Sequence, residues 1–215
     1  MIETSFNMSI VKIAIVNYQA GNIRSVAKAI EKAGVTPVIT DDPEVVKKAD
    51  GLVFPGQGAI DPAMRALKDK KLADPIKDFI QSGKPFLGIC LGLQLLLDSS
   101  EEGIERGMSL IKGTVRRFPP RLKIPHIGWN NVKLVRQIPL FHNIPKDSRF
   151  YFVHSYYADP LDSFFVGGLT NYGLDFCSVV AYDNVVATQF HPEKSGAIGL
   201  RIYQNFVNCV LAGGY

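Results

Sequence analysis

The chain has 215 residues, 47% of them hydrophobic, and a formal net charge of +4. This length and composition fit one large globular domain that buries its core without help from disulfides or metal ions. The three cysteines form no CxxC pair and the four histidines form no HExxH motif, so we expect no disulfide framework, no metal site and no cofactor.

The first nine residues lack the basic start and apolar run of a signal peptide, and no apolar run approaches the ~20 residues of a membrane helix. We therefore expect a cytoplasmic protein without membrane contact. Residues 1–9 are predicted to be an N-terminal extension and residues 10–215 one domain.

The first half of the chain alternates short apolar runs with helical patterns. Strands are expected at residues 10–16, 36–40, 51–56 and 84–90, and helices at 22–34, 41–49, 61–81 (interrupted near Pro75) and 91–100. Strands that are apolar throughout and separated by helices indicate a parallel sheet covered on both faces.

The second half of the chain is rich in strand patterns joined by turn signals. Strands are expected at residues 111–118, 130–135, 149–158, 176–182 and 184–190, with a closing helix at 196–212. The basic group Arg116–Lys123 contains two prolines and indicates a solvated loop, the alternative being a phosphate- or partner-binding segment; no nucleic-acid partner is expected. The sequence thus predicts a single three-layer α/β domain, with a central, mostly parallel sheet, helices on both faces and an antiparallel β addition.

Cys90 lies between Gly88 and Gly92, where a predicted strand runs into a predicted helix. A nucleophile on such a sharp turn needs strained backbone angles, and small neighbours let a substrate approach closely. The start of the following helix would supply free N–H groups and positive potential, which lower the pKa of a thiol and hold an oxyanion. The alternative is an inert buried cysteine, since free cysteines are often core residues.

The segment FPGQGAI, residues 54–60, follows the third predicted strand. Gly56 and Gly58 permit a backbone that turns its N–H groups outward, as an oxyanion hole requires, or they form an ordinary glycine turn. A dinucleotide-binding fingerprint is excluded, because the third glycine is missing and the segment does not follow the first strand.

The segment TQFHPEKS, residues 188–195, ends the last predicted strand at His191, because Pro192 cannot continue the strand pairing. If the chain stays extended, His191 and Glu193 point to the same side, so the carboxylate orients the imidazole and the other ring nitrogen serves as a base. A lone histidine at a strand end is more often structural. Here His191 is one of three segments, with the Cys90 turn and the glycine segment, that are each expected at the carboxyl end of a strand. Parallel sheets bind ligands at this edge.

In this order and spacing, PGQGA, GICLGLQLL and HPEKS resemble the motifs of class I, triad-type glutamine amidotransferases. The resemblance runs from about residue 10 to the C-terminus and implies the fold of that class. Within the class, NYQAGNIRSV (Asn17–Val26), PHIGWN (Pro125–Asn130) and YFVHSYY (Tyr151–Tyr157) resemble the glutaminase subunits of imidazole glycerol phosphate synthases. One departure is Gln57, where the family more often has valine.

The resemblance implies that Cys90 attacks the side-chain amide of glutamine to form a thioester, that His191 moves the protons and that Glu193 orients His191. The implied oxyanion donors are the N–H of Leu91 and a backbone N–H within Gly56, Gln57 or Gly58. The implied substrate-binding residues are Gln94, His154, Ser155 and Tyr156, and the implied partner-interface residues are Asn17, Asn22 and Trp129. The alternative for Gln94 is a partly exposed helix residue, and for residues 151–157 a core strand.

A glutaminase that worked alone would waste glutamine, and the chain has no P-loop with which to use the ammonia. The resemblance implies a heterodimer with a (β/α)₈-barrel cyclase subunit, which combines ammonia with a phosphorylated ribulosyl aminoimidazole carboxamide nucleotide. The products would be imidazole glycerol phosphate, for histidine biosynthesis, and aminoimidazole carboxamide ribotide. The resemblance also implies weak hydrolysis until the partner binds its nucleotide, with the oxyanion strand as the bistable element.

Three other functions fit parts of the sequence. The same catalytic residues would serve a glutaminase subunit for anthranilate, aminodeoxychorismate or pyridoxal phosphate synthesis, against which PHIGWN and YFVHSYY are the discriminating segments. A cysteine peptidase or deglycase of similar fold would lack the late His-Pro-Glu. A binding module with a decayed site is not favoured, because all three triad positions are filled.

Overall fold

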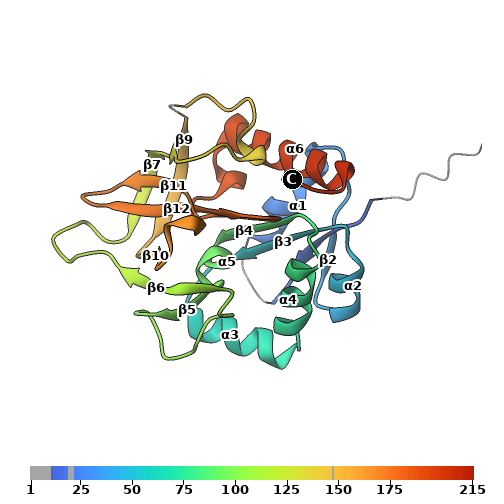
Figure 1. The fold of residues 1–215 in the computed structure, drawn as a ribbon, viewed down its shortest axis with the longest axis horizontal. Helices are drawn as coiled ribbons and strands as arrows, with labels where there is room; N and C mark the ends of the chain where they lie inside the picture. Colours follow the sequence, from blue (N-terminus) through green and yellow to red (C-terminus); the bar gives the residue numbers. More distant parts are fainter. Residues whose placement is uncertain (1–10, 19–21, 147) are drawn as a thin grey trace, which may run out of the picture.

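A twisted sheet runs through the centre of the protein (Figure 1). The computed structural model describes residues 11–18, 22–146 and 148–215, so the predicted extension at residues 1–9 lies outside the described residues. The strands are β1 (Ile13–Val16), β2 (Val38–Thr40), β3 (Gly51–Gly56), β4 (Phe86–Cys90), β5 (Leu97–Ser100), β6 (Ile111–Arg117), β7 (His126–Asn131), β8 (Lys133–Leu134), β9 (Arg149–His154), β10 (Tyr156–Pro160), β11 (Val166–Asn171), β12 (Asp175–Tyr182) and β13 (Val185–Thr188). The helices are α1 (Ile23–Lys32), α2 (Pro43–Lys48), α3 (Ile60–Asp69), α4 (Ala73–Gln81), α5 (Leu91–Gln94) and α6 (Gly196–Ala212), with 3₁₀ turns η1 (Pro139–Phe141), η2 (Ser163–Phe165) and η3 (Pro192–Lys194).

The strand order of the central sheet is β2-β1-β3-β4-β13-β12-β10-β6-β5, with β11 and β8 attached beside β12. Neighbours from β2 to β13 in this order are parallel. The pairs β13–β12, β12–β10 and β10–β6 are antiparallel. The predicted fold class, a mostly parallel central sheet with helices and an antiparallel addition from the second half, is confirmed.

Helices cover both faces of the parallel part of the sheet (Figure 1). Side chains of β1 alternate between two cores, with Ile13 and Ile15 in the core that α1 and α6 close. Ala14 and Val16 lie in the other core, which α2, α3 and α4 close. Because both faces are covered, β1 has no solvent-facing position, and this explains its uninterrupted apolar sequence.

A separate antiparallel pair, β7 with β9, lies outside the central sheet; we call it the β7–β9 ribbon. The predicted strand at 149–158 is therefore two strands, since the chain leaves the ribbon at His154 and enters the central sheet at Tyr156. Ser155 is the crossing point. The predicted strand at 130–135 overlaps the end of β7 and the short β8, and β11 was missed.

The predicted helix at 91–100 is wrong beyond Gln94. The helix α5 has only four residues, and the chain continues as β5, which pairs in parallel with β6 through Leu97 and Ile111. Leu95, Leu96 and Leu97 are all fully buried. Three consecutive buried side chains do not form the single apolar face of a surface helix, and the leucine run instead packs into the core in all directions.

The predicted helix at 61–81 is interrupted at a different place from the one expected. Helix α3 ends at Asp69, and Lys71 adopts a left-handed φ of 55° between α3 and α4. Pro75 lies in the first turn of α4, where proline is tolerated because its missing N–H has no helical partner there.

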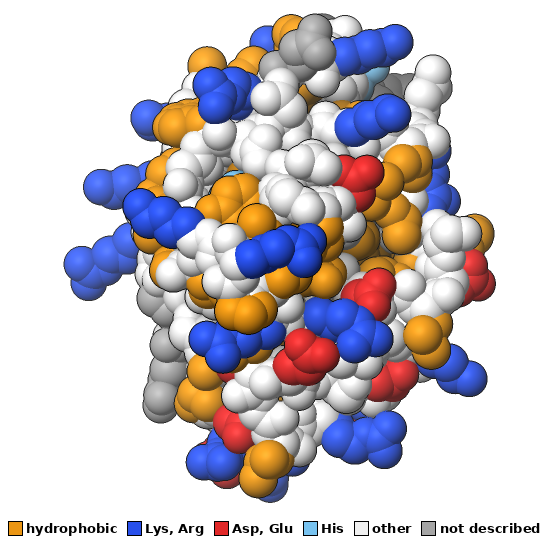
Figure 2. Space-filling model, turned by 90° about the vertical axis from the view of Figure 1, so that its left-hand side faces the viewer, with side chains coloured by type: hydrophobic (Ala, Val, Ile, Leu, Met, Phe, Trp, Pro, Cys, Tyr) orange, Lys and Arg blue, Asp and Glu red, His pale blue; other side chains and the backbone are white. Residues whose placement is uncertain are grey.

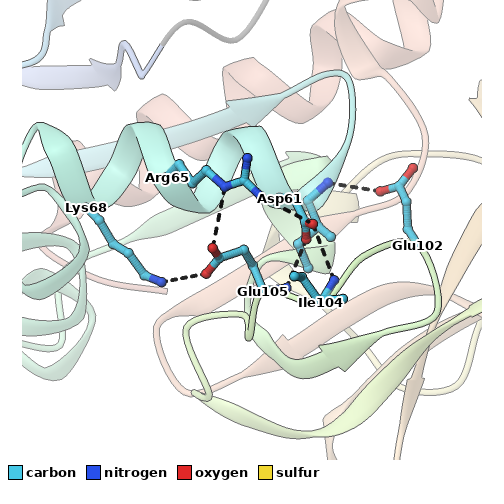
Figure 3. A network of polar contacts seen from close by, with 7 residues as sticks. Asp61, Arg65, Lys68, Glu102, Ile104 and Glu105 are labelled. Atoms are coloured by element: carbon cyan, nitrogen blue, oxygen red, sulfur yellow. Dashed lines mark hydrogen bonds and ion pairs between the residues drawn. The ribbon is translucent and has the colours of Figure 1, made fainter.

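A polar network fixes the start of α3 to the loop that follows β5 (Figure 3). The N–H of Ile60 donates to Glu102 at 3.0 Å, and Asp61 accepts from the N–H of Glu105 at 2.9 Å. Lys68, two turns further along α3, pairs with the Glu105 carboxylate at 2.6 Å. Because α3 begins directly after the segment that follows β3, this network anchors one end of the predicted oxyanion segment.

Candidate active site

Cys90 is the last residue of β4 and the residue before α5. Its backbone has φ 55° and ψ −107°, an arrangement that is uncommon for a residue with a Cβ and that marks stored strain at a functional turn. A Cβ on Gly92 would lie 1.9 Å from the Phe54 carbonyl oxygen, so only glycine fits there. The predicted nucleophile turn is present in geometry, but the single turn of α5 offers little of the helix potential that was expected.

His191 and Glu193 are held together beside the end of β13. The His191 Nδ1 and Glu193 Oε1 atoms are 2.7 Å apart, and each side chain is 2% exposed. The chain does not stay extended as predicted, because the strand ends at Thr188 and Pro192 starts the 3₁₀ turn η3. The 3₁₀ turn, rather than an extended strand, therefore brings the His191 and Glu193 side chains together. Since Nδ1 is bonded to Glu193, Nε2 is the nitrogen left for the thiol.

The pKa values of this pair show how strongly the two residues interact. Burial alone would lower the pKa of His191, but the charge and hydrogen bond of Cys90, followed by those of Glu193, raise it to about 9. Burial alone would raise the pKa of Glu193, but the hydrogen bond and charge of His191, with smaller effects including the amide of Asn22, hold it below its usual value. The site therefore favours a protonated His191 ring beside an anionic Glu193 carboxylate.

Two further side chains hold the Glu193 carboxylate. Asn22, at the start of α1, donates from Nδ2 to Glu193 Oε1 at 2.7 Å, and the Tyr203 hydroxyl donates to Oε2 at 3.4 Å. The structure thus places Asn22, predicted as an interface residue, in contact with the Glu193 carboxylate. Neither Tyr203 nor the contact of Asn22 was foreseen, because no sequence signal links residues so far apart in the chain.

Replacing Asn22 with glycine is expected to lower kcat/KM for glutamine hydrolysis about ten-fold, because hydrogen bonds to charged groups typically contribute about 1.5–3 kcal/mol. Glycine retains the left-handed φ of 66° that Asn22 adopts, so the backbone is not strained. The measurement is steady-state glutaminase kinetics, with Asn208→Ala on the exposed side of α6 as the control. A kcat/KM within two-fold of the wild type would show that the amide does not support Glu193.

The predicted oxyanion segment lies beside Cys90, the predicted nucleophile. Gly56 is the register partner of Cys90 across β3 and β4, and Gly58 has φ 91°. Gly56, Gln57, His191 and Glu193, among others, line the same small crevice. The glycine segment and the base therefore border the same space, as an acyl-transfer site requires.

Tyr18, at the end of β1, packs under this segment. Its hydroxyl oxygen lies 2.4 Å from the point that a Cβ on Gly56 would occupy, which explains why glycine is needed there. Its ring contacts Phe54 at a centroid distance of 5.2 Å. Burial, reinforced by the nearby Cys90, raises its pKa well above the usual value, so the hydroxyl stays neutral. Sequence reasoning gave Tyr18 no individual role.

Gln94, on α5, is buried rather than partly exposed. Its Nε2 donates to the Tyr156 carbonyl and to Gln189 Oε1, both at 3.0 Å. Gln189 in turn donates from Nε2 to Cys90 Sγ at 3.6 Å. Gln189 stands two residues before His191, inside a segment that the sequence singled out, yet the motif alone gave it no role.

The remaining predicted residues lie on several elements. The N–H of Leu91 follows Cys90 directly, and the backbone of Ser155 and Tyr156 crosses from the ribbon to the central sheet beside Gln94. Trp129 is 47% exposed on β7. Asn17 lies at the end of β1, where its N–H donates to the Thr40 carbonyl at 2.8 Å.

A larger hollow in the described part of the molecule lies elsewhere. It measures about 1470 Å³ and lies between residues 130–146 and the end of β11. No triad residue lines it. Hollow size alone therefore does not select the candidate active site, which is chosen from the geometry around Cys90.

The family model described as "Glutamine amidotransferase class-I" matches residues 14–209. The chain belongs to the class I glutamine amidotransferase family. The match covers β1 to α6, including the cysteine turn, the glycine segment and the His-Pro-Glu turn, so the family predicted from these three motifs is confirmed.

Two relatives are similar over nearly their whole length. Both carry the name imidazole glycerol phosphate synthase subunit HisH. The protein from Methanosarcina barkeri is 51% identical over 205 residues, covering 92% of this chain and 98% of that protein. The protein from Nostoc punctiforme is 49% identical over 199 residues, covering 91% of this chain and 94% of that protein.

Solved structures of amidotransferases share the fold at lower identity. PurLQS from Thermotoga maritima is 21% identical, with a TM-score of 0.72 over 93% of this chain and 99% of that chain. The glutaminase domain of CTPS from Trypanosoma brucei, solved with bound acivicin, is 18% identical, with a TM-score of 0.69 over 95% of each chain. At these identities the likeness concerns the fold alone.

Proposed function

We propose that this chain is the glutaminase subunit of imidazole glycerol phosphate synthase and that Cys90, His191 and Glu193 are its catalytic triad. The observation that carries the triad is the strained turn at Cys90 together with the 2.7 Å contact between His191 and Glu193. The pathway assignment is supported by HisH relatives about half identical to this chain over more than nine-tenths of it. The reaction is hydrolysis of L-glutamine to glutamate and ammonia, for imidazole glycerol phosphate formation in histidine biosynthesis.

The first half of the reaction forms a thioester. The sulfur of Cys90 attacks the side-chain amide carbon of glutamine, and His191 holds the thiol proton. The carbonyl oxygen becomes an oxyanion, for which the N–H of Leu91 and a backbone N–H of the segment Gly56–Gly58 are the donors. His191 then gives its proton to the leaving nitrogen, and ammonia departs.

The second half of the reaction regenerates the thiol. Water attacks the thioester carbon while His191 takes one of its protons, and the same imidazole returns that proton to the sulfur as glutamate leaves. Glu193 stabilises the imidazolium in both halves. Gln94, Ser155 and Tyr156 hold the amino-acid end of glutamine, mostly through backbone groups at the point where the chain passes from β9 to β10. The His154 ring lies next to these residues, with its Nδ1 atom 2.8 Å from the Tyr156 carbonyl oxygen.

We propose that the partner is a (β/α)₈-barrel cyclase subunit that receives the ammonia and docks near the β7–β9 ribbon. On this ribbon Ile127 is 59% and Trp129 47% exposed, and Trp129 contacts Tyr151 with ring centroids 6.1 Å apart. Figure 2 faces the left-hand side of Figure 1, from which several β strands project, and shows hydrophobic side chains mixed with Lys and Arg. An exposed tryptophan beside an exposed isoleucine favours a protein interface.

Two further predictions remain part of this proposal. The functional domain comprises residues 10–215, with residues 1–9 as an extension. The protein works in the cytoplasm, where Cys90, Cys177 and Cys209 stay reduced; all three are free thiols here. No helix in the described ranges is long and apolar enough to cross a membrane.

The test is glutamate release from glutamine by the purified chain, alone and with a cyclase subunit plus its nucleotide ligand. Strong stimulation by the liganded cyclase is expected, because the glycine segment is the element that the partner would switch. A full rate in the isolated chain would contradict this coupling. A rate of hydrolysis that depends on Cys90 but does not change when the liganded cyclase is added would assign the chain to another amidotransferase.

A further inference from the structure

Two buried histidines contact each other within the β7–β9 ribbon. His126 Nδ1 lies 3.0 Å from His154 Nε2, and the two residues are register partners across β7 and β9. The His126 ring stacks on Phe152 and Tyr172, with centroid distances of 5.0 and 4.0 Å. Two imidazoles in an aromatic cluster can share one hydrogen bond only if their protons are placed in a definite way.

The proton on His154 is fixed by its other neighbour. His154 Nδ1 lies 2.8 Å from the carbonyl oxygen of Tyr156, which can only accept, so Nδ1 carries the proton. Burial lowers the pKa of His154 to about 3, which keeps the ring neutral near pH 7. Its Nε2 therefore has no proton and accepts from His126.

The proton on His126 follows from this arrangement. Its Nδ1 donates to His154, and burial lowers its pKa to about 4, so its Nε2 is the acceptor. Asn130 Nδ2 lies 3.4 Å from that Nε2. The nitrogen and oxygen of the Asn130 amide cannot be exchanged by rotating the group. The Nδ2 atom also donates to the Asn171 carbonyl at 2.9 Å, and Oδ1 accepts from the Asn131 N–H at 2.8 Å.

At the other end, the Tyr156 carbonyl belongs to the active site. It also accepts from Gln94 Nε2, which is shared with Gln189 Oε1. Gln189 Nε2 then donates to Cys90 Sγ. A continuous series of hydrogen bonds thus joins Asn130, one residue after the exposed Trp129, to the nucleophile.

We infer that His126 and His154 are positioning residues, whose imidazoles relay the position of the β7–β9 ribbon to the Tyr156 carbonyl and so to Gln94, Gln189 and Cys90. Neither ring needs to touch glutamine. The effect on partner stimulation rests on the proposed function, since it requires the cyclase to bind at the ribbon. The proton arrangement does not, because it follows from the contacts of this chain alone.

The first test reads the proton positions directly. Long-range proton–nitrogen NMR spectra of the full chain, labelled with nitrogen-15 in its histidines, distinguish the two neutral forms of each ring. We expect His126 and His154 both to carry the proton on Nδ1 near pH 7, with signals assigned by their loss in His126→Asn and His154→Asn. A proton on Nε2 of either ring, or a charged ring, would overturn the relay.

The second test separates hydrogen bonding from packing. His126→Phe keeps an aromatic ring against Phe152 and Tyr172 but has no donor, whereas His126→Asn keeps a donor close to the Nδ1 position and loses the ring. In the complex with liganded cyclase, we expect His126→Phe to lower the ratio of stimulated to basal kcat about ten-fold. We expect His126→Asn to stay within three-fold of the wild type despite a lower melting temperature. His142→Phe, on an exposed histidine, is the control.

The possible results separate the relay from the proposed function. If stimulation follows packing, so that His126→Phe keeps it and His126→Asn loses it, the relay is overturned and the histidines are structural. Equal losses or no loss in both variants would overturn it too. If the wild type itself is not stimulated by the cyclase, the proposed partner is wrong, and the NMR spectra then decide the relay on their own.

Discussion

Replacing Cys90 with alanine is expected to lower glutamine hydrolysis by roughly 10⁴-fold or more, as removal of a covalent nucleophile does in other triad enzymes. The thioester cannot form without the sulfur, so the covalent route is lost. The measurement is glutamate release in the cyclase complex, where the wild-type rate is expected to be highest. A residual rate within a hundred-fold of the wild type would show that the nucleophile lies elsewhere.

The other cysteines supply matched controls. Cys177 is buried on β12, and burial raises its pKa to about 12, so it remains a thiol and a core residue. Cys209 lies half-buried on α6, and burial raises its pKa as well. Cys209→Ser is therefore expected to retain wild-type hydrolysis, and an iodoacetamide-type reagent should inactivate the wild type by labelling Cys90 first.

The same Cys90→Ala variant should change the titration of His191. In the wild type the pKa of this residue is raised to about 9, so its proton adds stability that is fully present below pH 6.5 and is lost as the pH rises through about 9. Without the sulfur, the pKa is expected to fall, because only Glu193 still favours the charged ring. An NMR titration of the His191 ring measures this. An unchanged pKa would mean that Cys90 and His191 do not share a proton.

Replacing Gly92 with alanine is expected to destabilise the protein by about 3 kcal/mol, the upper part of the range for inserting a methyl group into a packed core. The added Cβ would meet the Phe54 carbonyl oxygen at 1.9 Å, and this oxygen belongs to the central strand β3 rather than to a side chain that could turn away. Either β3 or α5 must move, and both carry oxyanion donors. The melting temperature should fall by roughly 6–12 °C, and hydrolysis should be largely lost.

Gly214 supplies the control for this substitution. A Cβ there meets nothing within 4 Å, so Gly214→Ala is expected to change the free energy of unfolding by less than about 0.5 kcal/mol. Thermal unfolding followed by circular dichroism compares the two variants. If Gly92→Ala unfolds at the wild-type temperature and remains active, the contact between α5 and β3 is looser than the structure shows.

Local patterns predicted the parallel half of the fold and the three site segments. The strands β1 to β4 are apolar on both faces, and the alternation of strand and helix patterns leaves few other topologies. The closing helix was predicted with the bounds of α6, which begins at Gly196 and ends before Gly213, a residue with a left-handed φ of 82°. The Cys90 turn and the pair His191–Glu193 were predicted from short motifs, because the chemistry there depends on residues close in sequence.

Contacts between distant segments could not be predicted in this way. Helical propensity favours residues 91–100 as a helix, but the pairing of β5 with β6 overrides it after Gln94. The donation from Asn22 to Glu193 spans 171 positions in the chain, and the contact between His126 and His154 requires two strands to pair outside the main sheet. Such contacts are set by topology and register, which a single sequence does not display.

The anchoring of α3 limits how the oxyanion segment could change state. Gly56 is fixed by its pairing with β4, and the Ile60 N–H is fixed by Glu102, so Gln57, Gly58 and Ala59 alone span the two fixed points. A bridge of three residues between fixed ends cannot swing outward like a lid. It can rotate a peptide plane, and Gly58, with φ 91°, has no Cβ to oppose that rotation. An activating partner would therefore act by reorienting one amide, and glutamine hydrolysis could be switched while the rest of the domain stays still.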